Sequence, residues 1–141
     1  MTDSIGSMRR RHRQTTVHAD LHTHTHCSDG RLSPDALVER AAERDIQVLS
    51  VTDHDTVEAV GPATANAEQV NIRLVSGIEL SVTVEGREIH LLAYGIDPEH
   101  TGLQRHLAAM QEARRDRAWT IVERLREKGV EIEDEQLRAD I

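Results

Sequence analysis

The chain has 141 residues, a formal net charge of −8, one tyrosine, one tryptophan and no phenylalanine. This length suits one domain with its own core, and no run of 18 apolar residues is present to span a bilayer. RNA-binding modules usually stack bases on several aromatic rings, so the composition disfavours that class. Cys27 is the only cysteine, which suits a reducing compartment. We expect a cytoplasmic protein that does not enter a membrane.

Residues 1–16 differ in charge from the rest of the chain. They carry Arg9, Arg10, Arg11 and Arg13 against a single acid, Asp3, and they lack the apolar segment of a signal peptide. We interpret them as a disordered basic tail. Such an arm can contact nucleic acid phosphates, but a solvated terminus has the same composition, so we do not expect stable nucleic-acid binding.

The segments after the tail alternate between strand and helix patterns. In chain order we predict a strand at 17–24, a helix at 32–45, a buried strand at 47–55, a weaker helix at 57–69 and a strand at 71–80. The first helix has Ser33 as its N-cap and Pro34 at its first position, and Gly61 and Pro62 weaken the second. This alternation predicts an α/β fold with a parallel sheet and right-handed crossovers.

The pattern changes in the second half of the chain. Residues 81–97 form two short apolar runs around Gly86, which predicts a hairpin that turns at this glycine. Apolar residues at helical spacing then predict a long helix from Thr101 to Gly129, and a further helix begins near Asp134. We therefore divide the chain into the tail, an α/β part at 17–100 and a helical part at 101–141.

Ionisable side chains stand at the ends of the predicted strands. His22 and His24 share one face of the first strand, because residues two apart on a strand point the same way. The later ones are, in chain order, Asp53, His54, Asp55, Glu79 and His90. Carboxylates and imidazoles bind first-row divalent ions, and the carboxyl ends of strands are where α/β sheets place ligands.

Each of these residues also has an ordinary structural interpretation. His54 could be a loop residue, Glu79 a solvated strand end, and His90 a core histidine bonded to a backbone carbonyl. A cluster of carboxylates and histidines on one rim would nevertheless repel or stay unsatisfied unless a cation neutralised it. The set as a whole therefore favours a metal site, which also accounts for the polarity of residues 20–30.

Four ordered motifs, HTHTHCSDG, TDHDT, GIELS and IHLLAYGID, resemble the PHP family, the polymerase and histidinol phosphatase superfamily. The resemblance covers about residues 17–97. It implies a distorted, TIM-like β/α barrel whose carboxyl rim binds up to three divalent ions, manganese, zinc or iron, and hydrolyses phosphoesters. A full β/α barrel runs to about 250 residues, so we expect the chain to be the amino-terminal half of one, followed by a helical insertion.

The resemblance also implies a ligand set. The matching positions are His22 and His24 for one ion, Glu79 bridging it to a second ion that His90 also holds, and Asp29 and His54 for the third. Asp20, Asp53 and Asp55 are then placed to orient the imidazoles. His18, His26 and Cys27 have no counterpart in the motifs, and we interpret them as non-ligands.

The predicted long helix resembles the helical insertion of the nucleotide phosphatase and oligoribonuclease branch of PHP proteins. Arg114, Arg115 and Arg117 there are available to hold a second phosphate or a nucleotide backbone, and we select Arg114 and Arg117 as substrate-binding candidates. A solvated helix face would show the same pattern.

The function that these observations favour is a metal-dependent phosphoesterase acting on a phosphorylated small molecule or a short oligonucleotide. A PHP-type exonuclease of either polarity is an alternative within the same chemistry. An amidohydrolase also uses two strand-borne histidines, but Ser-Asp-Gly and Thr-Asp-His-Asp-Thr fit the phosphoesterase better. An inactive PHP fragment with a structural role is the non-enzymatic alternative, because no ligand motif follows His90.

Overall fold

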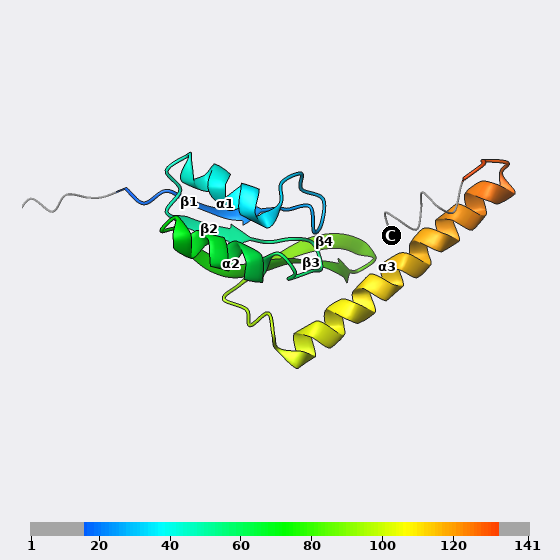
Figure 1. The fold of residues 1–141 in the computed structure, drawn as a ribbon. Coiled ribbons are helices and arrows are strands. Elements are labelled where there is room, and N and C mark those ends of the chain that lie inside the picture. Colours follow the sequence, from blue (N-terminus) through cyan, green and yellow to red (C-terminus); the bar gives the residue numbers. More distant parts are fainter. Residues whose placement is uncertain (1–15, 133–141) are drawn as a thin grey trace, which may run out of the picture.

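The computed structural model describes residues 16–132 (Figure 1). In chain order its elements are β1 (Ala19–Thr23), α1 (Pro34–Ala42), β2 (Val48–Val51), α2 (Val60–Gln69), β3 (Arg73–Val84), β4 (Arg87–Tyr94) and α3 (Thr101–Glu127). The predicted alternation of strands and helices is therefore confirmed. The basic tail up to residue 15 and the predicted helix near Asp134 lie outside the described residues. None of the helices in the described part is long and apolar enough to cross a membrane.

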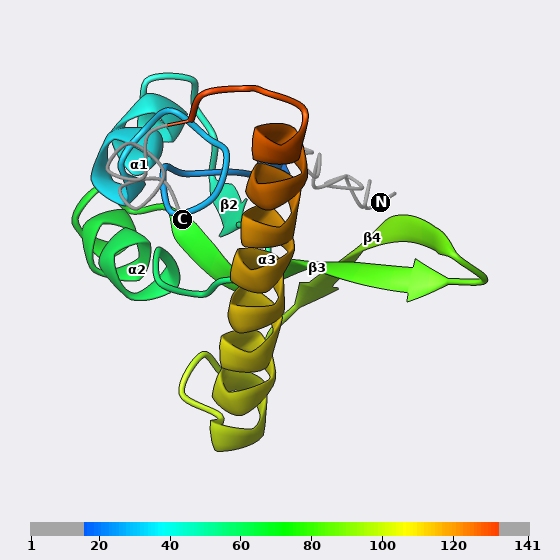
Figure 2. The same cartoon turned by 90° about the vertical axis from the view of Figure 1, so that its right-hand side faces the viewer.

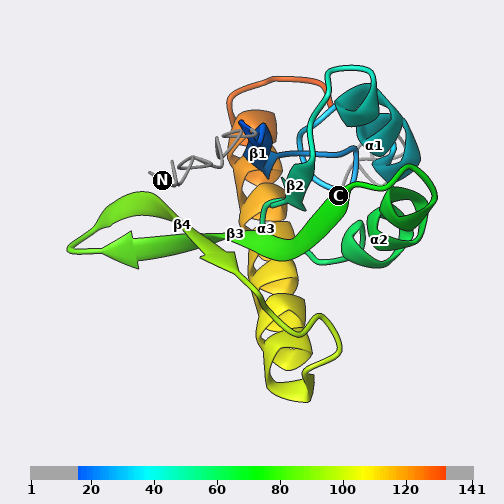
Figure 3. The same ribbon diagram turned by 90° about the vertical axis from the view of Figure 1, so that its left-hand side faces the viewer.

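The four strands form one curled sheet in the order β1-β2-β3-β4. The first three strands are parallel, as predicted, and β4 runs antiparallel to β3. α1 and α2 lie together against the parallel part, while the β3–β4 hairpin projects away from them (Figure 3). The predicted α/β half-barrel is thus present, with its sheet open at β1 and β4.

The third strand is longer than predicted. We predicted a strand at 71–80 and a separate hairpin at 81–97, whereas β3 continues from Arg73 to Val84 and forms the first arm of that hairpin. Its pairing changes partner at one point, since Ser76 is the last residue paired with β2 and Gly77 the first paired with β4. A Cβ on Gly77 would come within 2.8 Å of the Thr52 side chain, so a glycine is needed where the strand passes so close to β2.

A capping residue marks the start of α1 but not that of α2. α1 begins after Ser33, whose side chain accepts a hydrogen bond from the Ala36 N–H, with Pro34 at the first helical position as predicted. α2 begins at Val60 instead of residue 57 and has no side-chain cap. Val57, where we predicted the helix to begin, lies before it and is buried in the core.

The core consists of two clusters of buried residues. The first lies between α1, α2 and the parallel strands and contains Val38, Ala41, Leu49, Val51, Ala59, Ala63, Ala67 and Ile72. The second contains Val57, Val60, Ile78 and Leu107. Leu107 belongs to α3, so this cluster attaches the long helix to the α/β part. α3 then passes in front of the carboxyl ends of the strands (Figure 2).

Candidate metal centre

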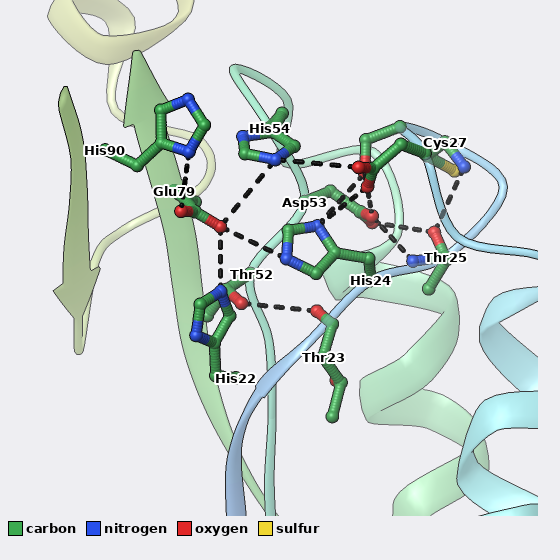
Figure 4. Close-up of polar contacts among 12 residues, drawn as sticks. His22, Thr23, His24, Thr25, Cys27, Thr52, Asp53, His54, Glu79 and His90 are labelled. Atoms are coloured by element: carbon green, nitrogen blue, oxygen red, sulfur yellow. Dashed lines mark hydrogen bonds and ion pairs between the residues drawn. The ribbon is translucent and has the colours of Figure 1, made fainter. Parts of the chain in front are cut away.

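The carboxyl ends of the strands bring together all six of the side chains selected as ligand candidates. Figure 4 labels five of them, His22, His24, His54, Glu79 and His90. His22 lies in β1 and His24 directly after it, His54 follows β2, Glu79 lies in β3 and His90 in β4, and Asp29 lies in the loop before α1. Three overlapping groups result: His22, His24 and Glu79; His24, Asp29 and His54; and His54, Glu79 and His90.

Glu79 lies at the centre of the four imidazoles. Its Oε2 is 2.8 Å from His22 Nε2, 3.1 Å from His24 Nε2 and 3.9 Å from His54 Nε2, and its Oε1 is 3.2 Å from His90 Nδ1. Its side chain is only 6% exposed. Both carboxylate oxygens are thus directed at different imidazoles, which is the arrangement required of a bridging ligand.

The pairing register of β3 and β4 places Glu79 and His90 on one face of the sheet. Ser81 pairs with His90 across β3 and β4, and Glu79 pairs with Leu92, so Glu79 and His90 are diagonal neighbours on the same side of the hairpin. A parallel bridge between His54 and Glu79 brings the end of β2 to the same position. The end of β2 and both arms of the β3–β4 hairpin therefore meet at Glu79.

Opposing effects act on the Glu79 carboxyl. Burial would by itself raise its pKa. The hydrogen bond with His22 and the charges of His54, His22 and His24 outweigh burial and hold the pKa of Glu79 below its ordinary value. The site therefore favours the carboxylate form, which is the form that binds cations.

The donor set fits divalent transition ions. Every group combines imidazole nitrogens with a carboxylate oxygen, and the possible ligand atoms of each group lie within 4.8 Å of one another. An ion bound at about 2.0 to 2.2 Å from nitrogen and oxygen donors keeps its ligand atoms within about 4.4 Å of one another, so these groups are already close to the spacing of a metal site. The Nδ1 atom of His54 is buried and has no hydrogen-bond partner among residues 16–132. Buried polar atoms usually have a partner, so this nitrogen is an unsatisfied polar atom inside the cluster.

Asp53 organises the loop that carries His24 and Asp29. Its carboxylate is buried and accepts hydrogen bonds from Thr25 N–H at 2.6 Å, Thr25 Oγ1 at 2.7 Å and Ser28 Oγ at 2.6 Å. Ser28 Oγ in turn lies 3.4 Å from His24 Nδ1. We predicted that Asp53 helps to orient the imidazoles. In the structure it acts on His24 through the loop backbone and Ser28.

Gly30 closes the same loop. Its N–H donates to the Thr25 carbonyl at 2.9 Å, and a Cβ at this position would come within 2.7 Å of Thr25 N and closer still to the His24 carbonyl. The glycine of the Ser-Asp-Gly stretch therefore permits the close approach that keeps Asp29 near His24, at 3.2 Å between Asp29 Oδ1 and His24 Nδ1.

The other two predicted orienting carboxylates contact other groups. Asp20 Oδ1 accepts from the His22 backbone N–H at 3.4 Å. Asp55 is buried and has a left-handed backbone with φ of 53°, and its Oδ1 accepts from the Ser81 N–H at 2.7 Å. Its Oδ2 lies 3.4 Å from Arg114 Nη2. Asp55 therefore links the end of β2 to both β3 and α3.

The two substrate-binding candidates of α3 have different environments. Arg114 lies beside Asp55 and lines a pocket of about 700 Å³ that also contains Asp29, His54 and His90. Arg117 does not line this pocket, and its Nη1 lies 3.6 Å from Glu88 Oε2.

Sequence reasoning missed the role of Ser28 and Glu88. Glu88 lies 3.8 Å from His90 Nε2, on the same face of β4. Strand alternation could have identified it, since residues 88 and 90 are two apart. Ser28 has no such signal, because its partner Asp53 is distant in the sequence. Non-ligand status for His18, His26 and Cys27 stays a prediction, and none of these three belongs to a candidate metal group within residues 16–132.

The chain is similar to proteins of one known family. The PHP domain family matches residues 20–123. The chain is 43% identical over 108 residues to the 5'-3' exoribonuclease Rnm of Escherichia coli, covering 75% of this chain and 37% of that protein. It is 37% identical over 99 residues to the 3',5'-nucleoside bisphosphate phosphatase of Chromobacterium violaceum, covering 70% of this chain and 35% of that protein. The chain thus spans a little over one third of the length of these curated relatives.

Solved structures support the same assignment. The crystal structure of a Bifidobacterium adolescentis protein, described as a metal-dependent phosphoesterase, superposes on this chain with a TM-score of 0.78 at 30% identity. The superposition covers 89% of this chain and 43% of that one. A Chromobacterium violaceum protein described as an amidohydrolase, with bound sulfate and no metal, superposes with a TM-score of 0.74 at 34% identity, over 81% of this chain and 40% of that one. The fold and the family match over residues 20–123 together show that the chain belongs to the PHP family.

Proposed function

We propose that the chain is the amino-terminal part of a metal-dependent phosphoesterase that hydrolyses nucleotide or related phosphate esters. The observation that carries this proposal is the buried Glu79 carboxylate, which faces four imidazoles at 2.8 to 3.9 Å. The names of the relatives also support it, because they include an exoribonuclease and a nucleoside bisphosphate phosphatase.

The chain would hold the ions through the three donor groups. We assign His22, His24 and Glu79 to one ion, His54, Glu79 and His90 to a second, and His24, Asp29 and His54 to the third group of donors. The resemblance assigned only Asp29 and His54 to the third ion, and His24 now joins them as a shared neighbour. Divalent ions in such sites lower the pKa of water and neutralise charge on phosphate oxygens.

The protein residues contribute binding and orientation. Asp53 and Ser28 hold the loop of His24 and Asp29 in place, so these side chains keep their positions while substrate binds. Arg114 contributes a guanidinium to the adjoining pocket, where it can donate hydrogen bonds to phosphate oxygens. We propose manganese, zinc or iron as the resident ions and the cytoplasm as the location, which suits a chain with one cysteine.

The ligand count predicts how active the 141-residue chain is. Catalytic ions usually have about three protein ligands each. A neutral imidazole has one free lone pair, so His24 and His54 can each serve only one ion at a time. With Glu79 as the bridging ligand, the six candidates therefore supply about seven bonds, which is fewer than three for each of three ions. The sheet is also open, with Ile89, Leu91 and Tyr94 of its edge strand exposed, which favours aggregation. We expect weak metal binding and little phosphatase activity from these 141 residues, and manganese-dependent hydrolysis of nucleotide phosphates by a longer chain that continues through further strands.

The test measures phosphate release from adenosine 3',5'-bisphosphate by both chains, with and without manganese. In the longer chain His22→Ala should abolish turnover, whereas the exposed His26→Ala should not. Robust manganese-dependent turnover by the 141-residue chain, abolished by His22→Ala, would show that its site is already complete. Hydrolysis of a cyclic amide instead of the phosphate ester would favour the amidohydrolase alternative.

A further inference from the structure

Asp55 lies between the candidate metal centre and α3. It directly follows His54, its side chain is 2% exposed, and it lines the same pocket as His54 and His90. Its backbone is left-handed, with φ of 53°, a conformation that aspartate and asparagine adopt more readily than most residues. Asp55 belongs to none of the candidate donor groups within residues 16–132. Its contacts therefore suggest a role other than that of a ligand.

One carboxylate oxygen of Asp55 continues the pairing of β2 with β3. The Glu79 N–H donates to the Asp53 carbonyl at 3.2 Å, and the Asp55 N–H donates to the Glu79 carbonyl at 3.0 Å. The Ser81 N–H comes next in this series, and it donates to Asp55 Oδ1 at 2.7 Å instead of to a backbone carbonyl. Ser81 pairs with His90 across β3 and β4. This side chain thus fixes the backbone just after Glu79 and opposite His90.

The other carboxylate oxygen of Asp55 faces α3. Oδ2 is buried and has no hydrogen-bond partner among residues 16–132, and Arg114 Nη2 lies 3.4 Å from it. An unpaired buried carboxylate is costly, so the guanidinium supplies the opposite charge that this oxygen requires. Leu107 attaches the start of α3 to the second core cluster, and Arg114 lies about two turns further along. The ion pair therefore holds the part of α3 that lines the pocket beside the metal centre.

We propose that Asp55 is a positioning residue that links the docking of α3 to the geometry of the candidate metal centre. Its Oδ1 holds the Ser81 backbone, two residues after Glu79, and its Oδ2 holds Arg114. Such a linkage is reciprocal, so metal bound at Glu79 favours the docked helix by the same factor as the docked helix favours metal. This inference rests on the proposed function, because it takes Glu79 as a metal ligand.

Three substitutions separate the roles of the two oxygens. Asp55→Gly removes both oxygens and leaves the left-handed backbone unstrained. Asp55→Asn keeps an oxygen for the Ser81 N–H but removes the charge, and Arg114→Gln removes the partner of that charge. Two measurements on the 141-residue chain then report on the two sides of Asp55. Isothermal titration with manganese measures metal affinity, and hydrogen exchange with and without manganese measures the docking of α3.

We expect Asp55→Gly to weaken manganese binding at least about 30-fold, because the backbone beside Glu79 loses its support. Asp55→Asn and Arg114→Gln should weaken it only about fivefold. Without metal, the amides of α3 beyond Leu107 should exchange at least about fivefold faster in both of these variants. The double variant should exchange no faster, because both changes remove the same ion pair. Saturating manganese should slow this exchange about fivefold in the unchanged chain and not in Asp55→Asn.

The matched controls are Asp116→Asn and Arg124→Gln, which make the same chemical changes at exposed positions of α3. Both should bind manganese and exchange like the unchanged chain. Equal manganese affinities in Asp55→Gly and Asp55→Asn would overturn the inference, as would unchanged α3 exchange in Asp55→Asn and Arg114→Gln. If Asp55→Gly does not fold, the linkage is still decided, since slowing by manganese that persists in Asp55→Asn would contradict it. Failure of the proposed function is recognised separately, as absent phosphoester hydrolysis by the longer chain.

Discussion

Replacing Glu79 by glutamine is expected to weaken manganese binding at least about 100-fold. The substitution keeps the size of the side chain but removes the carboxylate charge that faces four imidazoles. Loss of a residue that only supports a ligand already costs about 10- to 100-fold in metal affinity, so loss of a ligand shared by two ions should cost more. Isothermal titration with manganese measures the effect.

Two exposed residues provide controls for this variant. Glu68→Gln makes the same chemical change on the outer surface of α2, and His26→Ala removes an imidazole that belongs to none of the candidate groups in the described residues. Both should bind manganese like the unchanged chain. Equal losses of affinity in Glu79→Gln and His26→Ala would reject the central position that we give to Glu79.

The substitution Asp53→Ala is expected to destabilise the fold by about 3 to 5 kcal/mol. The carboxylate is 1% exposed and accepts three hydrogen bonds of 2.6 to 2.7 Å. Without it, the N–H and hydroxyl of Thr25 lose their buried acceptor, and Ser28 loses the contact that positions it beside His24. Urea unfolding in the absence of metal measures the change.

Asp116→Ala is the matched control for Asp53, since it removes an exposed carboxylate from α3. An exposed substitution of this kind usually changes the free energy of unfolding by less than about 0.5 kcal/mol. A similarly small change for Asp53→Ala would mean that the loop of residues 24–30 does not depend on this carboxylate.

Much of the α/β part could be predicted from local patterns. The apolar run before Asp53 identified a buried strand, and Ser33 with Pro34 identified the start of α1, because capping acts within a few residues. The change of partner at Gly77 could not be predicted in the same way. At Gly77 the strand passes close to Thr52, just after β2, and the sequence around residue 77 does not reveal that contact.

The candidate site was also predictable only in part from the sequence. The convergence of His22, His54 and Glu79 followed from their places at the ends of parallel strands, which meet at one edge of the sheet. The contacts of the buried carboxylates did not follow. Whether Asp53 meets an imidazole or Ser28 depends on the path of the loop after β1. That path involves contacts between residues far apart in the sequence, such as the hydrogen bond from Ser28 to Asp53.

The most direct test of the central claim, that Glu79 bridges ions held by histidines, is anomalous diffraction from crystals of the chain soaked in zinc. Our account predicts zinc peaks beside both Glu79 oxygens, one near His22 and His24 and the other near His54 and His90, each about 2.0 to 2.2 Å from its ligands. Zinc bound elsewhere on the chain, with no peak within bonding distance of the Glu79 carboxylate, would contradict it.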